Sequence, residues 1–263
     1  MAKPEVAVIG GTGFESLLTG ARTFRVKTPY GTTLQVYSGK LGGKDIIFLP
    51  RHGRDHSVPP HKINYRANIY ALHKLGIKRV LAINAVGAIN ATFKPGDLVV
   101  PHDFVDFTKL RATTFYDKKP VTHVDFSQPY CPEIRGLLIR KANEINVRVW
   151  DRAVLACTEG PRYETPAEIE MLRRCGCDIV GMTGCPEAAL ARELEMCYAT
   201  VCFVSNMAAG MQKRLTMLEL GQISKRIRPK MEQLLIETIE ALPTERGTQC
   251  PCSKALDRGS SSV

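Results

Sequence analysis

The sequence predicts an α/β fold, a single-domain three-layer sandwich in which a mixed central sheet is flanked by helices. Short apolar runs alternate with amphipathic segments, which is typical of a sheet covered by helices on both faces. Several connections are long, which favours a mixed sheet over a purely parallel one. Since no linker, repeat or second core interrupts the pattern, residues 1–243 are assigned to one domain and residues 244–263 to a C-terminal tail that contains a Cys-Pro-Cys sequence.

Strands are predicted where short apolar runs stand between turn residues, and helices where apolar residues recur at helical spacing. Residues 32–39 and 45–49 are expected to pair with each other. Residues 102–130 are polar, aromatic and irregular, and are expected to form a long loop. Pro229 should kink the last helix or divide it in two. The predicted strands are 5–9, 32–39, 45–49, 78–85, 97–101 and 152–157, and the predicted helices are 63–75, 133–146, one that begins near Thr165, and 216–242.

Three predicted strand ends in the second half of the chain carry polar side chains of different kinds. Glu164 follows the strand 152–157 after a turn, Thr183 follows a short apolar run, and Asn206 ends the next one. Ligands in open α/β sheets bind outside the carboxyl ends of strands, so we place the site there. Beside Glu164, the aromatic face of Tyr163 suits a flat ring that carries hydrogen-bonding groups.

An anion-binding sub-site is predicted from the first half of the chain. The glycine-rich loop Gly10–Gly13 lets the backbone approach a phosphate and adds the hydroxyl of Thr12, although a plain turn is the alternative. A dinucleotide-binding fingerprint is not predicted, because Ser16 replaces its third glycine and the ribose-binding acid is missing. Arg51 and His52 directly follow a predicted strand, as a phosphate clamp would, and a solvated loop is the alternative there.

The bulk composition limits the class of protein. Hydrophobic residues make up 44% of the chain and charged residues 24%, which are ordinary globular values. No apolar run approaches the roughly 18 residues that span a membrane, and no signal-peptide pattern is present, so a cytoplasmic protein is expected. The net charge is +10, but Lys and Arg are scattered, which favours attraction of anionic substrates over nucleic-acid binding.

Nine cysteines are many for a cytoplasmic protein. Two pairs have Cys-x-Cys spacing, Cys175 with Cys177 and Cys250 with Cys252. Zinc sites usually place roughly two to four residues between paired ligands and need four ligands, so a metal is not expected. Buried free thiols and intracellular disulfides, a feature of hyperthermophile proteins, both stay open.

Six motifs occur in order along the chain: GGTG (10–13), PRHG (50–53), NYRAN (64–68), TEGPRYET (158–165), MTGCPEAALARE (182–193) and SNMAAG (205–210). Together they resemble the trimeric purine nucleoside phosphorylase and methylthioadenosine phosphorylase family, and the resemblance covers about residues 5–242. It implies a nucleoside phosphorylase-like fold. It also implies phosphorolysis, in which phosphate attacks the anomeric carbon of a nucleoside while the base departs.

The resemblance implies roles for single residues. Met182 would pack on the ribose, and Glu164 and Asn206 would bind the purine. His123 would reach the site of a neighbouring subunit, so a homotrimer or a dimer of trimers is expected. The residues expected to hold phosphate are Thr12, Arg51, His52, Asn84, Ala85 and Thr183, and those expected to contact the nucleoside are Tyr163, Glu164, Met182, Asn206, Ala208, Met217 and His123.

Base specificity is predicted from residues 205–208. Methylthioadenosine phosphorylases carry Thr-Asp-x-Asp where this chain has Ser-Asn-Met-Ala, so both aspartates are absent. Glu164 can accept from N1–H and the 2-amino group of guanine, while Asn206 can donate to O6 and accept from a protonated N7. This pairing would stabilise the purine as charge builds on it. Met217, expected near the 5′ group, would favour an apolar 5′-methylthio substituent.

The predicted function is phosphorolysis of 6-oxopurine nucleosides to the free purine and (5-methylthio)ribose 1-phosphate. The substrates are inosine and guanosine, with 5′-methylthioinosine as a further candidate. A 5′-methylthioadenosine phosphorylase is the alternative, and a nucleoside- or nucleic-acid-binding module is a third, non-enzymatic hypothesis. Because phosphate is itself the nucleophile, no metal, organic cofactor or covalent enzyme intermediate is expected.

Overall fold

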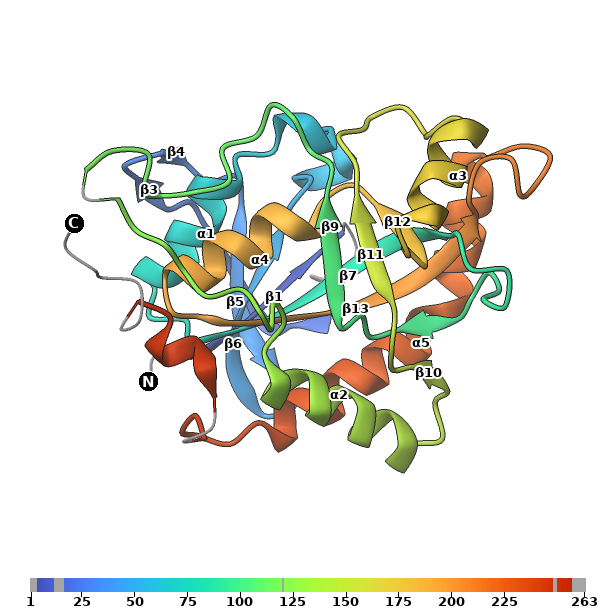
Figure 1. Cartoon of the computed structure of the whole chain (residues 1–263). Coiled ribbons are helices and arrows are strands. Elements are labelled where there is room, and N and C mark those ends of the chain that lie inside the picture. Colours follow the sequence, from blue (N-terminus) through green and yellow to red (C-terminus); the bar gives the residue numbers. More distant parts are fainter. Residues whose placement is uncertain (1–3, 12–16, 120, 248–249, 257–263) are drawn as a thin grey trace.

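The computed structural model describes residues 4–11, 17–119, 121–247 and 250–256. A mixed sheet of 11 strands runs through this described part of the chain, and helices cover both of its faces (Figure 1). The predicted α/β sandwich with a mixed central sheet is therefore confirmed. Within the same residues, no helix is both long and apolar enough to cross a membrane.

Four strands form the parallel centre of the sheet. β1 (Val6–Gly10) lies between β6 (Lys44–Pro50) and β7 (Arg79–Ala88), and β13 (Cys197–Met207) pairs with the other edge of β7. These strands are mostly buried on both faces, which explains their continuous apolar runs in the sequence. Their shared direction brings four carboxyl ends to one edge of the sheet.

Shorter strands extend the sheet on both sides. β5 (Val36–Leu41) pairs antiparallel with β6, which confirms the pairing predicted between 32–39 and 45–49. β12 (Ile179–Gly181) pairs antiparallel with β7 and parallel with β11 (Val154–Cys157). The other strands of this sheet are β2 (Thr19–Phe24), β8 (Leu98–Val99), β9 (Asp103–Asp106) and β10 (Val149–Trp150), while β3 (Lys27–Thr28) and β4 (Gly31–Thr32) form a separate two-stranded sheet.

The helices form two layers against the sheet. α1 (Tyr65–Lys74) and α4 (Gly184–Glu193) contact each other on one face, and α2 (Pro132–Glu144) and α5 (Met217–Ala241) contact each other on the opposite face (Figure 1). α3 (Pro166–Arg174) lies near β12 and packs against the end of the sheet. Alternate residues of each central strand therefore enter different layers.

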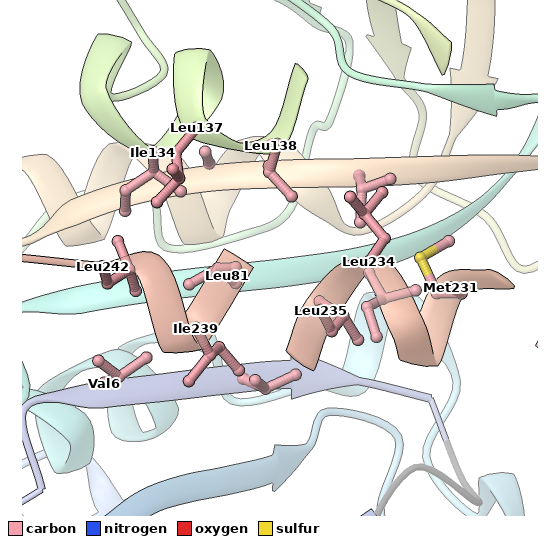
Figure 2. Packing of buried hydrophobic residues seen from close by; sticks show 14 of the residues in the cluster. Val6, Leu81, Ile134, Leu137, Leu138, Met231, Leu234, Leu235, Ile239 and Leu242 are labelled. Atoms are coloured by element: carbon pink, nitrogen blue, oxygen red, sulfur yellow. The ribbon is translucent and has the colours of Figure 1, made fainter. Parts of the chain in front are cut away.

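One hydrophobic core lies between the sheet and the α2–α5 layer (Figure 2). Leu235 and Ile239 of α5 pack there with Val6 of β1 and Leu81 of β7. The described end of the C-terminal tail also enters this core, because Cys250 and Cys252 are buried in it. The boundary placed between residues 243 and 244 stays a prediction.

Two expectations of the sequence analysis need correction. The stretch 102–130 is not irregular throughout, because Asp103–Asp106 forms β9 and pairs in parallel with β11. This strand has four residues and polar ends, so no apolar alternation reveals it. Of the two alternatives expected at Pro229, the division of the helix is wrong, since α5 is one continuous helix, and the kink stays a prediction. Pro229 is exposed, so the carbonyl that loses its N–H partner can bond to water instead.

Candidate active site

A cavity of about 620 Å³ opens at the carboxyl ends of the central strands. Its wall comes from the ends of β7 and β13, the segments that follow β6, β11 and β12, and the chain around the start of α5. Most of the predicted site residues line it, namely Arg51, His52, Asn84, Ala85, Tyr163, Glu164, Met182, Thr183, Asn206 and Ala208.

Two groups of lining residues differ in chemistry and in what holds them. One group combines cationic, hydroxyl and amide groups and is called the anion half. The other combines an aromatic ring, a carboxylate and an amide and is called the ring half. The anion half is Arg51, His52, Asn84, Ala85 and Thr183, and the ring half is Tyr163, Glu164, Asn206 and Ala208.

Arg51 follows β6 directly, and its guanidinium is almost completely buried. The carboxylate of Glu187 in α4 accepts from Nε at 2.6 Å and from Nη2 at 2.9 Å, and the carbonyl of Ile83 accepts from Nη1 at 2.5 Å. Burial alone would lower the pKa of Arg51, but the charge and hydrogen bonds of Glu187 raise it, so the side chain stays a cation. A guanidinium has five N–H donors, so two remain for an anion in the cavity.

His52 is buried beside Arg51, and its ring stacks on that of His56 with 4.0 Å between the centroids. Burial, helped by the charge of Arg51, lowers the pKa of His52 to about 4, so the ring is neutral at pH 7. Nδ1 lies 2.8 Å from the carbonyl oxygen of Val58, which can only accept, so Nδ1 carries the proton. Nε2 is then an acceptor, which suits a protonated phosphate oxygen.

Buried hydrogen bonds join Asn84 to Thr183. The hydroxyl of Thr183 donates to Oδ1 of Asn84 at 2.9 Å, and Nδ2 of Asn84 donates to the hydroxyl of Thr200 at 2.7 Å. Thr183 directly precedes α4, so the positive end of that helix lies at the wall of the anion half. Ala85 is exposed within an otherwise buried strand because it lines the cavity.

In the ring half, Glu164 lies on the segment between β11 and α3 and is half-buried. The hydroxyl of Thr158 donates to its Oε1 at 2.6 Å. The next residue, Thr165, caps α3 in a reciprocal capping box with Glu168, which fixes the backbone directly after Glu164. Burial and the charge of Glu164 raise the pKa of the Tyr163 phenol, so this ring is neutral in its working range.

Asn206 lies near the end of β13, just after a β-bulge. The register with β7 shifts between Val204 and Asn206, and such bulges redirect side chains next to active sites. The hydroxyl of Ser205 donates to Oδ1 of Asn206 at 2.6 Å, and Nδ2 donates to the carbonyl of Met207 at 2.9 Å. The second amide hydrogen and the second lone pair of Oδ1 remain for a ligand.

Arg111, which was not among the predicted site residues, holds the segment that carries Tyr163 and Glu164 of the ring half. Its buried guanidinium donates to the carbonyls of Met182 at 2.5 Å, Glu159 at 2.6 Å and Thr158 at 3.2 Å. Gly160 allows the close approach of this segment, because a Cβ there would lie 2.6 Å from Sδ of Met182 and its φ is +64°. Arg111 has no pattern around it in an irregular stretch, so no local signal marks it.

Three predicted residues are not placed in the cavity wall. Thr12 and the side chain of Met217 lie outside the described residues. His123 is exposed and does not line the cavity, and its reach toward a neighbouring subunit stays a prediction. Besides Glu187 and Arg111, the sequence analysis missed the lining residues around the start of α5, which are Leu215, Leu220, Gly221 and Ser224.

The chain matches the phosphorylase superfamily over residues 5–240. It is 51% identical over 255 residues to a protein from Methanopyrus kandleri named probable S-methyl-5′-thioinosine phosphorylase. The alignment covers 96% of this chain and 98% of that protein. It is 50% identical over 263 residues to a protein from Thermococcus kodakarensis named probable 6-oxopurine nucleoside phosphorylase. The alignment covers 96% of this chain and 97% of that protein.

A solved structure is similar over almost the whole chain. It is a methylthioadenosine phosphorylase sourced from an antarctic soil metagenomic library, with a TM-score of 0.91 and 33% identity, and the match covers 97% of this chain and 92% of that one. The range 5–240 that matches the superfamily includes the central strands and every lining residue of the cavity. This chain is therefore a member of the phosphorylase superfamily.

Proposed function

We propose that this chain is a purine nucleoside phosphorylase that acts on 6-oxopurine nucleosides. One observation carries the proposal: the carboxylate of Glu164 and the amide of Asn206 line the same cavity as the cationic and polar groups of the anion half. Such a cavity fits a purine at one end and phosphate at the other. The names of the relatives at 51% and 50% identity, which refer to S-methyl-5′-thioinosine and to 6-oxopurine nucleosides, support it.

The ring half favours a 6-oxopurine for a chemical reason. The carboxylate of Glu164 accepts from N1–H of hypoxanthine or guanine, whereas the unprotonated N1 of adenine would repel it. Asn206 has one amide hydrogen left for O6, and its Oδ1 can accept from a protonated N7 beside the hydrogen bond from Ser205. An aspartate at position 206 would suit the 6-amino group and N7 of adenine, and this chain has none there.

The anion half binds and orients phosphate. Arg51 offers its two remaining N–H groups, and the N-terminus of α4 adds a positive potential. Nε2 of His52 accepts a hydrogen bond from a phosphate hydroxyl. A phosphate oxygen then bonds to the anomeric carbon as the bond to N9 breaks. The sugar passes through an oxocarbenium-like state. The purine takes up a proton from solvent at N7 as it leaves, and Oδ1 of Asn206 accepts a hydrogen bond from that N–H. Positioning and electrostatics supply the rate, without a covalent enzyme intermediate.

The proposal extends beyond a single chain. The enzyme works as a homotrimer in which His123 reaches a neighbouring cavity, it is cytoplasmic, and its reaction needs no metal or organic cofactor. Met182 packs on the ribose, and a methionine at position 217 favours a methylthio substituent at the 5′ position.

Initial rates with and without phosphate on inosine, guanosine, S-methyl-5′-thioinosine and S-methyl-5′-thioadenosine test the proposal. We expect phosphate-dependent turnover, with kcat/KM about 10 to 100 times higher for the 6-oxopurines, because an unpaired buried polar group costs about 1–3 kcal/mol. Faster turnover of S-methyl-5′-thioadenosine would instead support the alternative that the solved structure at 33% identity suggests. Ligand binding without any turnover would support a binding module.

Two variants locate the base-reading groups. Glu164→Gln should lower kcat/KM for inosine by about 100-fold with little change in the KM for phosphate, because a charged acceptor is lost. Asn206→Asp should shift the preference toward the 6-amino nucleoside by about tenfold or more. Glu170→Gln, at a surface carboxylate of α3 that pairs with Arg173 and Arg174, is the matched control and should change neither parameter. Unchanged inosine kinetics in Glu164→Gln would contradict the assignment.

A further inference from the structure

Four cysteines meet in the core on the α2–α5 side of the sheet. Cys131 directly precedes α2, Cys197 begins β13, and Cys250 and Cys252 belong to the described end of the C-terminal tail. Their Sγ atoms all lie within 4.8 Å of one another, and none of the four residues is more than 2% exposed. Three segments that are far apart in the sequence thus bring four thiols to one buried point.

The spacing of these sulfurs fits a tetrahedral metal site. A zinc–sulfur bond of about 2.3 Å places the sulfurs of such a site about 3.8 Å apart. The Sγ atoms of Cys131 and Cys250 are 3.8 Å apart, and those of Cys197 and Cys250 are 3.4 Å apart. Bonded sulfurs in a disulfide would be about 2.05 Å apart, and all four thiols are free. The arrangement is that of a ligand set rather than of two bonded pairs.

A buried cation stands beside the cluster. Arg79 and Cys197 are partners in the parallel register of β7 and β13, so their side chains leave the same face of the sheet. Arg79 is 2% exposed, its Nη1 donates to the carbonyl of Thr244 at 3.4 Å, and its Nη2 has no hydrogen-bond partner among the described residues. An uncompensated buried guanidinium is unfavourable, and a zinc–tetrathiolate, which is doubly negative, would compensate it.

We propose that Cys131, Cys197, Cys250 and Cys252 bind one zinc ion in a structural site. Each thiol releases its proton to solvent as its sulfur bonds to the ion. All four coordination positions are filled by protein, so none is left for water or substrate. The Cys-x-Cys spacing alone supplies only two ligands, and the other two lie 53 and 119 positions earlier in the chain, which is why the sequence analysis expected no metal.

The site fastens the tail to the core and takes no part in the reaction. Cys197 begins β13 and Asn206 lies near its end, so the two are on the order of 30 Å apart at about 3.3 Å per residue. Removal of zinc should therefore lower the melting temperature and leave turnover per folded molecule unchanged. This proposal does not depend on the proposed function.

The metal content of the full-length protein, purified without oxygen from cells supplied with zinc, tests the site. We expect about one zinc ion per chain, released when a mercurial reagent titrates the thiols, and the visible absorption of tetrahedral cobalt after exchange with Co²⁺. Cys250→Ser should lower the bound zinc at least tenfold, because Cys250 makes both short contacts. Cys175→Ser, at the exposed cysteine of the other Cys-x-Cys pair, is the control and should keep its zinc.

Three results would overturn the proposal. The first is an intact mass that lacks four thiol hydrogens in a zinc-free protein, which would mean two disulfides. The second is a fully reduced protein that takes up no zinc from solution, and the third is iron in place of zinc. These measurements use the natural chain, so they remain decisive where Cys250→Ser does not fold.

Discussion

The two halves of the cavity are held in different ways. In the anion half, Arg51, Asn84 and Thr183 are buried, and strands or α4 supply their hydrogen-bond partners. In the ring half, Tyr163 and Glu164 are half-buried on the segment between β11 and α3. The anion half is thus part of the core. Of the four residues of the ring half, Tyr163 and Glu164 are carried by a segment that the core supports, whereas Asn206 and Ala208 are buried at the end of β13 and directly after it. Changes in the anion half should therefore affect folding and phosphate binding together, whereas changes at Tyr163 or Glu164 should affect the recognition of the base with little effect on folding or on phosphate binding.

The largest effect is expected at Glu187, whose ion pair with Arg51 anchors the anion half in the core. Glu187→Leu leaves the Arg51 cation buried without its partner, so the free energy of unfolding should fall by about 3–5 kcal/mol. The double variant Arg51→Met with Glu187→Leu removes both charges and should regain most of this stability, yet have no phosphate-dependent turnover. Urea unfolding, followed by fluorescence and circular dichroism, measures the free energy of unfolding of both variants.

Tyr198→Phe is the matched control for this pair. It removes only the hydroxyl that donates to Glu187 at 2.7 Å and keeps the ion pair, so the loss should be about 1–2 kcal/mol. If Glu187→Leu were no more destabilising than Tyr198→Phe, the anion half would not be anchored in the core by this ion pair.

The next largest effect is the pH dependence of stability that arises from His52 in the anion half. The pKa of His52 is lowered to about 4 by burial, against about 6.5 in the unfolded chain. Between these values the unfolded state binds more protons, so the contribution of His52 is complete above about pH 6.5 and is lost as the pH falls through about 4. Between pH 7.5 and about 4.5 the loss should reach roughly 2 kcal/mol.

Urea unfolding at both pH values, on the natural chain and on His52→Gln, measures this contribution. On acidification, the free energy of unfolding of His52→Gln should fall by roughly 2 kcal/mol less than that of the natural chain. His73→Gln, at an exposed histidine of α1, should behave as the natural chain does. Equal pH dependence in all three proteins would mean that His52 is not held neutral in the folded state.

Some residues of the site could be predicted from the sequence because a local pattern marks them, and others could not. Arg51 and His52 directly follow a buried strand, and Asn206 ends another, so a strand pattern with a polar residue at its end located them. Glu187 was missed because it meets Arg51 from 136 positions away, and no local pattern marks such a pair. Arg111 was missed for the same reason, since its partners lie 46 to 71 positions away.

The same limit applies to the fold. Strands buried on both faces, such as β1 and β7, were predicted because their residues form continuous apolar runs. The edge strand β2 was missed, because its sequence TGARTF is mostly exposed and shows neither an apolar run nor alternation. The cysteine cluster depends on the packing of the tail against α2 and β13, which spacing in the sequence does not reveal.

The smallest effect is expected in the ring half, where Thr158 donates to Glu164 at 2.6 Å. Thr158→Val keeps the shape of the side chain and removes this hydrogen bond, so Glu164 loses one of the groups that orient it. The kcat/KM for inosine should fall by about tenfold, since a hydrogen bond to a charged group contributes about 1.5–3 kcal/mol and part of this is regained by water at a half-exposed site. Thr158→Ser, which keeps the hydroxyl, should restore the rate. Neither variant should change the KM for phosphate, because the hydroxyl of Thr158 bonds to Glu164 and to the carbonyl of Gly181, and neither residue belongs to the anion half. A parallel rise of that KM in Thr158→Val would mean that the two halves of the cavity are coupled, and that the ring half is as much a part of the core as the anion half.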